Sequence, residues 1–163
     1  MSLDNSPKLK VLDVMTTQVI TVKENQTTQQ AARLLSQYRI SGLPVVNDDN
    51  VLVGVVTEYD VISKEGQRVR DIMTRAVISV GEDTDLEEVR RILVHERIKR
   101  LIVLDQGKLV GIVSRADLVK EVAERWVCNV CGEVVHNERL PENCPRCGAE
   151  GVVAMVEPMS PGS

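Results

Sequence analysis

Aromatic residues are scarce in this chain, and an excess of positive charge is absent. Aromatic side chains make up 2% of its 163 residues and phenylalanine is absent, so we expect an aliphatic core. Few rings are left on which unpaired bases could stack, which argues against a surface for single-stranded nucleic acid. The 20 Lys and Arg residues are outnumbered by 24 Asp and Glu residues, giving a net charge of −4. That sign disfavours duplex DNA and an anionic membrane as partners.

Long apolar runs are missing as well. No run approaches the roughly 20 residues that a membrane-spanning helix needs. Residues 1–8 also lack the apolar segment of a secretory signal. The hydrophobic content of 43% is nevertheless ordinary for a globular protein. We therefore expect a soluble, cytoplasmic protein, with frayed ends at residues 1–10 and 158–163.

Two short motifs each occur twice, in the same order. Asp-apolar-Met-Thr stands at residues 13–16 and again 58 positions later, at residues 71–74. Gly-apolar-apolar-Thr/Ser-x-x-Asp stands at residues 54–60 and again 57 positions later, at residues 111–117. The first copy therefore holds one additional residue, for which Asp48 in the polar turn is the candidate. Such a repeat predicts two supersecondary units that pack on one another and present two equivalent clefts for ligands.

Within each copy, the hydrophobic pattern predicts strand, helix, strand, strand, helix. In the first copy we expect strands at 19–22, 43–46 and 52–56 and helices at 27–38 and 57–64. In the second copy we expect strands at 77–80, 101–104 and 109–113 and helices at 86–96 and 115–125. The sequence Thr84-Asp85-Leu86-Glu87 predicts a capping box at its helix. The fold class is thus α+β, with two βαββα repeats forming a pseudo-twofold module at residues 11–66 and 67–125.

Each copy has a strand-to-helix junction with a hydroxyl residue followed three positions later by an aspartate. These are Thr57-x-x-Asp60 and Ser114-x-x-Asp117. In one interpretation, the unpaired N–H groups at the helix start bind a phosphate, and the aspartate accepts hydrogen bonds from a ribose. In the other, each pair is only a capping box that stabilises the helix start. The sequence leaves both open, and the two roles are compatible.

Three motifs recur in order in both copies: the two above and a central segment at residues 40–45 or 98–103. On these motifs, residues 10–124 resemble a tandem pair of cystathionine-β-synthase (CBS) domains, often called a Bateman module. The resemblance implies face-to-face sheets, disk-like homodimers and adenosyl ligands such as AMP, ADP, ATP or S-adenosylmethionine.

The resemblance also implies roles for individual residues. Asp60 and Asp117 would bind ribose, and Thr57 and Ser114 would bind phosphate. The adenine slot would be lined by Ile40, Pro44 and Val56, or by Ile98 and Val113, with backbone near Val19 and Val77 reading the base.

The two copies differ in charge near their junctions. Copy two has Lys99-Arg100 where copy one has Ser41-Gly42. Additional cations favour a polyphosphate, so we expect the Asp117 site, with Arg100, to prefer the more phosphorylated ligand. The alternative is that these cations form a solvated basic face.

Four cysteines follow the repeats, in two Cys-x-x-Cys pairs. Cys128, Cys131, Cys144 and Cys147 offer four thiolates at the spacing of a tetrahedral metal site. Two disulfides are the competing interpretation, which an intracellular chain disfavours. A segment this short has almost no apolar core, so we expect metal binding to fold residues 126–157.

This segment resembles the rubredoxin-like tail of rubrerythrins. That family binds iron, whereas similar zinc ribbons bind zinc, and both ions accept four thiolates. One zinc or iron ion per chain is therefore expected. His136, with four cysteines already available, is expected to be a solvated hairpin residue. Residues 127–157 carry two arginines and five glutamates, a net charge of −3 that disfavours a nucleic-acid role for the ribbon.

Three functional hypotheses follow. The preferred one is a regulatory sensor in which an adenosyl ligand binds the repeats and the metal ribbon acts as an output or docks an unknown protein partner. The second is a nucleotide-gated electron-transfer protein with an iron–thiolate centre. The third, a nucleic-acid-binding regulator, is disfavoured by the ribbon's charge. The sequence argues against an enzyme, because it offers no nucleophile–base pairing, no open metal position and no Gly-rich phosphate loop followed by Lys.

Overall fold

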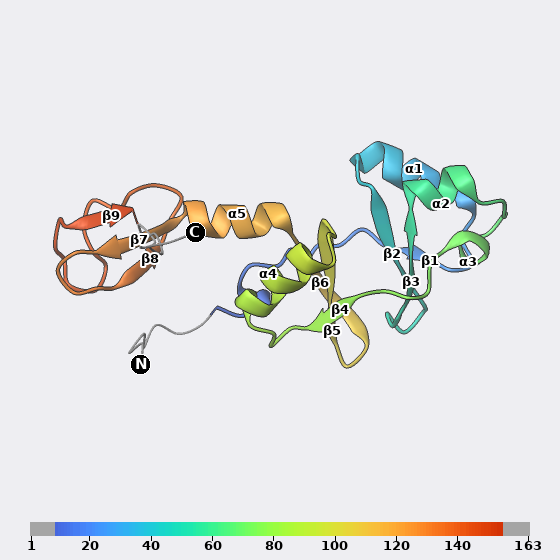
Figure 1. Ribbon diagram of the computed structural model, residues 1–163. Coiled ribbons are helices and arrows are strands. Elements are labelled where there is room, and N and C mark those ends of the chain that lie inside the picture. Colours follow the sequence, from blue (N-terminus) through green and yellow to red (C-terminus); the bar gives the residue numbers. More distant parts are fainter. Residues whose placement is uncertain (1–8, 155–163) are drawn as a thin grey trace. The chain divides into compact units, whose positions relative to one another are not determined.

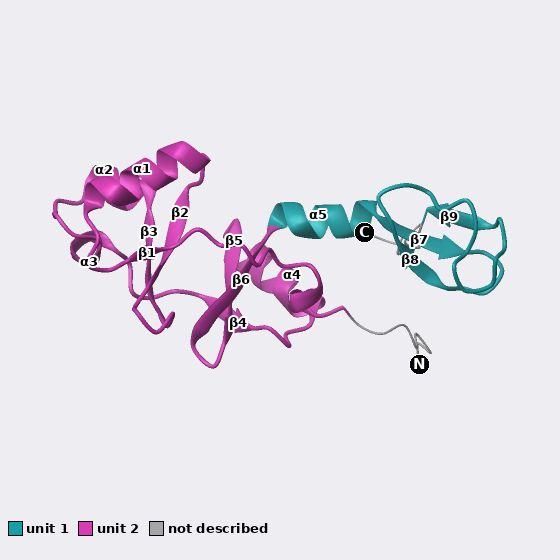
Figure 2. Cartoon of the chain, turned by 180° about the vertical axis from the view of Figure 1, so that it is seen from behind, with its two compact units in different colours: residues 1–8, 115–163 teal, residues 9–114 magenta. Residues whose placement is uncertain are grey.

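The computed structural model describes residues 9–154 and divides them into two compact units (Figures 1 and 2). Residues 9–114 form one unit, and residues from Arg115 onward form the other. The frayed ends expected at residues 1–8 and 158–163 lie outside the described residues. Leu9 and Lys10, which were expected to be frayed, are bonded: the carbonyl of Leu9 accepts the N–H of Leu86, and Lys10 pairs with Asp85.

The first repeat forms a three-stranded sheet with helices packed on it. Its strands are β1 (Val22–Lys23), β2 (Gly42–Val46) and β3 (Leu52–Thr57), in that spatial order. β1 runs parallel to β2, and β2 runs antiparallel to β3. Helix α1 (Thr28–Tyr38) packs against β2 and against α2 (Glu58–Ser63) (Figure 1).

The second repeat has the same sheet topology. Strand β4 (Ser79–Gly81) is parallel to β5 (Arg100–Asp105), which is antiparallel to β6 (Lys108–Ser114). Helix α4 (Leu86–His95) packs against β5. Helix α5 (Arg115–Ala123), which the sequence assigned to this repeat, belongs to the other compact unit together with the cysteine segment.

Local signals explain α1. The Thr27 hydroxyl accepts the N–H of Gln30, whose side chain accepts the N–H of Thr27, so a capping box starts the helix. Ala31 and Leu35, one turn apart, are buried against the sheet. Arg39 ends the helix in the left-handed conformation, with φ of 51°.

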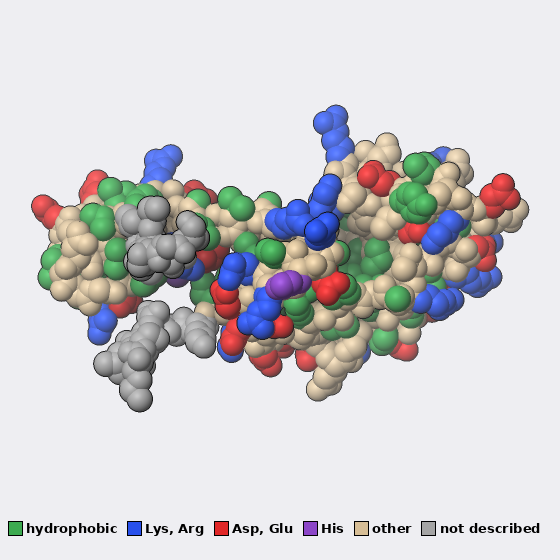
Figure 3. All heavy atoms as spheres, viewed as in Figure 1, with side chains coloured by type: hydrophobic (Ala, Val, Ile, Leu, Met, Phe, Trp, Pro, Cys, Tyr) green, Lys and Arg blue, Asp and Glu red, His purple; other side chains and the backbone are tan. Residues whose placement is uncertain are grey.

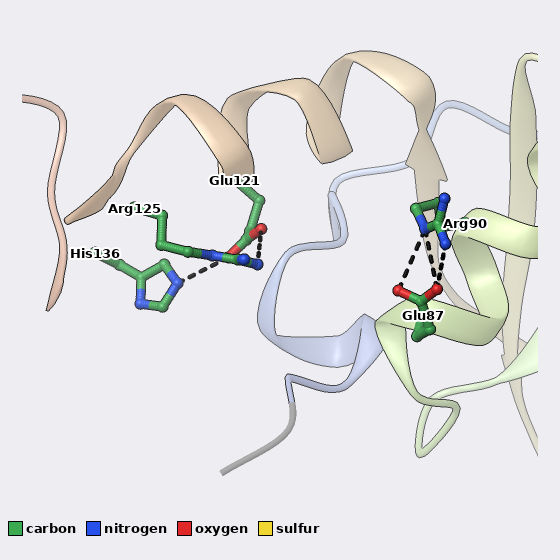
Figure 4. Close-up of polar contacts among 5 residues, drawn as sticks. All are labelled: Glu87, Arg90, Glu121, Arg125 and His136. Carbon is green, nitrogen blue, oxygen red and sulfur yellow. Dashed lines mark hydrogen bonds and ion pairs between the residues drawn. The ribbon is translucent and has the colours of Figure 1, made fainter. Parts of the chain in front are cut away.

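The capping box predicted at Thr84 is wrong. The N-cap of α4 is Asp85, which makes no side-chain cap bond to the helix. Glu87 pairs with Arg90 one turn along the helix, so its carboxylate is engaged there (Figure 4). Thr27-x-x-Gln30 thus forms a capping box, whereas Glu87, at the same spacing from Thr84, forms a surface ion pair with Arg90 instead.

The two repeats exchange their Asp-apolar-Met-Thr motifs. The second motif, in α3 (Val69–Ile72) and Met73, packs into the core of the first repeat with Val22, Leu43 and Val56. The first motif begins at the last residue of η1 (Val11–Asp13) and bonds to the second repeat, where Thr16 and Ile112 each donate an N–H to the other's carbonyl.

Glycines allow these crossings. A Cβ on Gly54 would lie 2.8 Å from the carbonyl oxygen of Thr74, and one on Gly111 would lie 3.1 Å from that of Thr16. Isolated bridges pair Val55 with Thr74 and Thr16 with Ile112 beside them. In each copy, the glycine of Gly-apolar-apolar-Thr/Ser-x-x-Asp therefore lies beneath the Asp-apolar-Met-Thr motif of the other copy.

The additional residue of the first copy lies in the expected turn. The β2–β3 register pairs Val46 with Leu52, and the β5–β6 register pairs Leu104 with Leu109. These equivalent pairs enclose residues 47–51 in the first copy and 105–108 in the second, so the turn that contains Asp48 is one residue longer.

The strands predicted at 19–22 and 77–80 are shorter and shifted, since β1 begins at Val22 and β4 at Ser79. Val19 and Val77 instead pack beside a buried cluster of Val46, Ile102 and Leu109. Their β-branched side chains therefore serve packing between the repeats rather than strand pairing.

The cysteine segment forms a small antiparallel sheet that was not predicted. Its strands are β7 (Arg125–Cys128), β8 (Val134–His136) and β9 (Val152–Ala154), with β7 in the middle. Within residues 9–154, no helix combines the length and apolar character that crossing a membrane would require.

Candidate metal centre and nucleotide site

The four predicted cysteines converge. Their sulfur atoms all lie within 4.8 Å of one another. The Sγ–Sγ distance is 3.7 Å between Cys128 and Cys147 and 3.6 Å between Cys131 and Cys144. A disulfide needs about 2.05 Å, whereas thiolates about 2.3 Å from a tetrahedral metal ion stand about 3.8 Å apart. The cluster therefore fits one four-coordinate metal ion.

Each Cys-x-x-Cys pair is shaped by the same turn. The N–H of Gly132 donates to the carbonyl of Cys128 at 2.9 Å, and the N–H of Gly148 donates to that of Cys144 at 2.8 Å. Both glycines have φ of +76°, in the left-handed region. A Cβ at either position would meet nothing within 4 Å, so backbone conformation rather than space requires glycine there.

Backbone hydrogen bonds and the neighbouring sulfurs change the thiol pKa values of Cys128 and Cys131. Hydrogen bonds from the N–H groups of Cys131 and Val130 lower the pKa of the Cys128 thiol to about 6. At Cys131 the N–H of Glu133 lowers the pKa, but desolvation and the other three sulfurs outweigh it and raise the pKa to about 12. Four thiolates at this distance thus need a positive ion, which deprotonates coordinating thiols when it binds.

A buried carboxylate joins the ribbon to helix α5 (Figure 4). The Glu121 side chain is 5% exposed. Its Oε2 accepts Arg125 Nη2 at 2.8 Å, and its Oε1 lies 2.7 Å from His136 Nε2 on β8. His136 is therefore not merely a solvated hairpin residue, as the sequence suggested, because its ring contacts a buried acid.

Two further contacts strengthen this joint. The N–H of Asn137 donates to the carbonyl of Glu124 at 2.9 Å, and the indole N–H of Trp126 donates to the carbonyl of Asn137 at 2.8 Å. The Trp126 ring also packs beside the buried cluster of Cys128, Cys144 and Val152. The chain's single tryptophan thus reports on both the metal centre and the helix–ribbon joint.

The first junction is a complete capping box. Thr57 ends β3, and its hydroxyl accepts the N–H of Asp60 at 3.2 Å. Asp60 Oδ2 accepts the N–H of Thr57 at 2.9 Å and the Thr57 hydroxyl at 3.0 Å. Asp60 Oδ1 pairs with Lys64 Nζ at 2.8 Å. Burial alone would raise the pKa of Asp60, but these hydrogen bonds from Lys64 and Thr57 lower it below its usual value. The capping interpretation therefore describes the structure.

The other residues assigned to nucleotide binding differ in how deeply their side chains are buried. Val56 and Val113 are fully buried, and Pro44 is buried as well. Their side chains pack in the core, and their place in an adenine slot stays a prediction. Ile40, Ile98, Val19 and Val77 are partly buried, and Arg100 is exposed at the start of β5.

The second junction lies at the border between the compact units. Ser114 is the last residue of β6, and Arg115 is the first of α5. Both Ser114 and Asp117 are half-buried. Only the first junction thus lies wholly within one unit.

Comparison with known families agrees with both parts of the chain. The model of the CBS domain family matches residues 11–65 and 69–124. This chain belongs to the CBS domain family. A second family model, of the rubredoxin-like domain of rubrerythrin, matches residues 126–151, which hold all four cysteines.

Individual relatives are similar over the CBS pair. The CBS domain-containing protein YhcV of Bacillus subtilis is 35% identical over 138 residues, covering 77% of this chain and 98% of the relative. An inosine-5'-monophosphate dehydrogenase of Methanocaldococcus jannaschii is 38% identical over 114 residues, 68% of this chain, but the chain spans only 23% of that enzyme.

Two solved structures carry adenosyl ligands. CBSX2 in complex with AMP is 34% identical, with a TM-score of 0.64 over 68% of this chain and 93% of that one. The CBS domain pair of MJ0100, in complex with 5'-methylthioadenosine and S-adenosyl-L-methionine, is 30% identical, with a TM-score of 0.62 over 70% and 95%.

Sequence reasoning missed Lys64, Glu121 and Arg125. Both Asp60–Lys64 and Glu121–Arg125 are spaced i,i+4 on helices, a signal for ion pairs that was available. The contact of Glu121 with His136 joins a helix to a strand 15 residues away, and no local sequence pattern predicts it.

Proposed function

We propose that this protein is a regulatory sensor that binds an adenosyl ligand in its CBS pair and carries one zinc or iron ion in its ribbon. The observation that carries the proposal is the likeness to CBS pairs complexed with AMP and with S-adenosyl-L-methionine. In this chain Thr57, Asp60, Ser114 and Asp117 would hold the phosphate and the ribose. A hydroxyl at a helix start and an acid one turn later suit those two groups.

Helix α5 would carry the signal to the ribbon. The helix begins directly after Ser114, and its other end is fixed to the ribbon through Glu121, Arg125 and His136. A ligand that prefers one arrangement of α5 would shift the population of that arrangement, and the ribbon would follow. The ribbon would thereby act as an output or as a docking element for a protein partner.

A regulatory role also fits the extent of the matches. The similarity to inosine-5'-monophosphate dehydrogenase covers 23% of that enzyme, so its activity does not carry over to this chain. We propose that the chain is not an enzyme. Figure 3 shows acidic and basic side chains interspersed on the visible face of the ribbon unit, which gives nucleic acid no continuous positive surface there.

An electron-transfer role is the second candidate, favoured by the rubredoxin-like match. Iron in this centre would cycle between its ferrous and ferric states, and the nucleotide would gate the exchange. Red, freshly purified protein with visible thiolate-to-iron absorbance would support this role. Colourless protein with one zinc per chain would refute it.

We further propose a cytoplasmic homodimer formed through the CBS helices. Support comes from large apolar side chains on α2, since Tyr59 is 68% and Ile62 is 84% exposed. Such exposed apolar groups gain free energy when a second surface covers them.

Native mass spectrometry of untreated protein tests the proposal, because it reports the metal, any retained ligand and the oligomeric state together. Calorimetric titration with AMP and ATP should then show binding that Asp117→Ala weakens. Asp48→Ala is the control, since that aspartate is 97% exposed in a turn remote in sequence from both junctions. Equal affinities in the unsubstituted chain, Asp117→Ala and Asp48→Ala would refute the sensor role. So would the absence of binding of any adenosyl ligand.

Arg100→Ala tests the preference between ligands. If Arg100 contacts a polyphosphate at the second site, this variant should lose affinity for ATP and keep its affinity for AMP. An unchanged ATP affinity would leave Arg100 as part of a solvated basic face.

A further inference from the structure

Lys64 binds Oδ1 of Asp60, the carboxylate oxygen that takes no part in the capping box. Oδ2 of Asp60 already accepts two hydrogen bonds from Thr57. Oδ1 is bound by Lys64 Nζ at 2.8 Å, and the Asp60 side chain is 4% exposed. A ribose hydroxyl approaching this buried carboxylate would therefore compete with the lysine for Oδ1.

The lysine is held at two points and can still leave. Its Nζ also donates to the carbonyl oxygen of Ile72 at 3.2 Å. The Lys64 side chain is 42% exposed, however, so its ammonium group has a path to solvent. A long, flexible side chain of this kind can exchange a buried carboxylate for water.

The second repeat has the opposite charge at the equivalent position. The repeats are offset by 57 residues at their junctions, so Lys64 corresponds to Glu121 and Asp60 to Asp117. Glu121 bonds instead to Arg125 and His136 of its own unit. The second repeat therefore has no lysine equivalent to Lys64 four positions after its aspartate.

We propose that Lys64 is a specificity-determining residue that closes the first junction by holding Asp60. An adenosyl ligand binds there only after the Asp60–Lys64 pair opens. This inference rests on the proposed function of the CBS pair. Breaking a charged hydrogen bond at a buried carboxylate corresponds to an affinity penalty of about tenfold or more.

The test removes the lysine and titrates the first site alone. In an Asp117→Ala background, the full-length, metal-loaded protein carrying Lys64→Met is titrated with adenosine by calorimetry. Adenosine has no phosphate, so a lost positive charge does not itself weaken its binding. We expect the affinity to rise about tenfold relative to Asp117→Ala alone.

Lys23→Met is a closely matched control. Lys23 is 41% exposed, pairs with Asp48 at 2.9 Å and donates to the carbonyl of Asn47 at 3.2 Å. It thus makes the same two kinds of contact as Lys64, but its carboxylate partner is exposed. Lys23→Met should leave adenosine affinity unchanged, and an equal rise in both variants would overturn the inference.

A measurement on the native lysine covers the case in which Lys64→Met does not fold. With Asp117→Ala alone, the nitrogen NMR signal of Lys64 Nζ should shift at saturating adenosine, while that of Lys23 stays in place. An unmoved Lys64 signal at saturation overturns the proposal. If the unsubstituted chain binds an adenosyl ligand but Lys64→Met does not raise the affinity for adenosine, only this inference is refuted. If neither the unsubstituted chain nor any variant binds an adenosyl ligand, the proposed function is refuted as well.

Discussion

Replacing Gly54 by alanine should destabilise the CBS unit, because this glycine is where the two repeats cross. The new Cβ would lie 2.8 Å from the carbonyl oxygen of Thr74 and 3.0 Å from the sulfur of Met73. The methionine can adjust its flexible side chain. The Thr74 backbone cannot move freely, since it exchanges two hydrogen bonds with Val55 at 2.8 and 2.9 Å.

The magnitude follows from two opposing effects. Inserting a methyl group into a packed contact of this kind costs roughly 1–3 kcal/mol. Replacing glycine by alanine also restricts the unfolded chain, which returns about 0.4–1 kcal/mol. We therefore expect a net loss of about 1–2 kcal/mol in the free energy of unfolding. Gly111→Ala should behave alike, because its Cβ would meet Met15 and the carbonyl of Thr16.

Gly81→Ala is the control, since a Cβ there meets nothing within 4 Å and φ is not positive. It should be neutral or stabilise the protein by about 0.4–1 kcal/mol. Urea unfolding, followed by far-ultraviolet circular dichroism on metal-loaded protein, measures all three variants. If Gly54→Ala were as stable as Gly81→Ala, the crossing of the repeats at this glycine would be refuted.

Three further predictions concern the ribbon, its joint with α5 and the first junction. Cys144→Ser should remove the metal and change Trp126 emission, while circular dichroism retains the signal of the CBS unit; retained metal at full stoichiometry would contradict this. Glu121→Ala should lower ribbon stability by about 1.5–3 kcal/mol in thermal melts followed at Trp126, because it leaves His136 and the neighbouring arginine without their buried acid. The pKa of Asp60 lies below its usual value of 3.8 in the folded state, so the stabilisation from its ionised form is present above that pH and disappears as pH falls through the folded pKa. Asp60→Asn should therefore flatten the stability curve in that acidic range, and an unchanged curve would refute the link.

Much of the CBS unit follows from local patterns. Ala31 and Leu35 at helical spacing, with Thr27 in front of them, predict α1 to within one residue of its observed start. The duplicated motifs likewise predict two equivalent sheets, which have the same strand order and directions. These features depend on residues close together in the chain, where spacing and side-chain type decide the conformation.

The ribbon and the chemistry at its joint were harder to predict. β8 and β9 have three residues each, too few for a periodic pattern, and they pair with β7 across intervening loops. His136 could be described only as a hairpin residue, because its contact with Glu121 depends on how β8 meets α5.

The duplicated repeat, the helices α1, α2, α4 and α5 and the four cysteines can be read from the amino-acid sequence alone, because each is encoded in short-range spacing. That each repeat places its opening motif over the glycine of the other became visible only in the folded chain. The folded chain alone also shows that Lys64 holds Asp60 while Glu121 holds His136. The physical reason is that such side chains choose among several partners, and the packing of distant segments determines which partner is within reach.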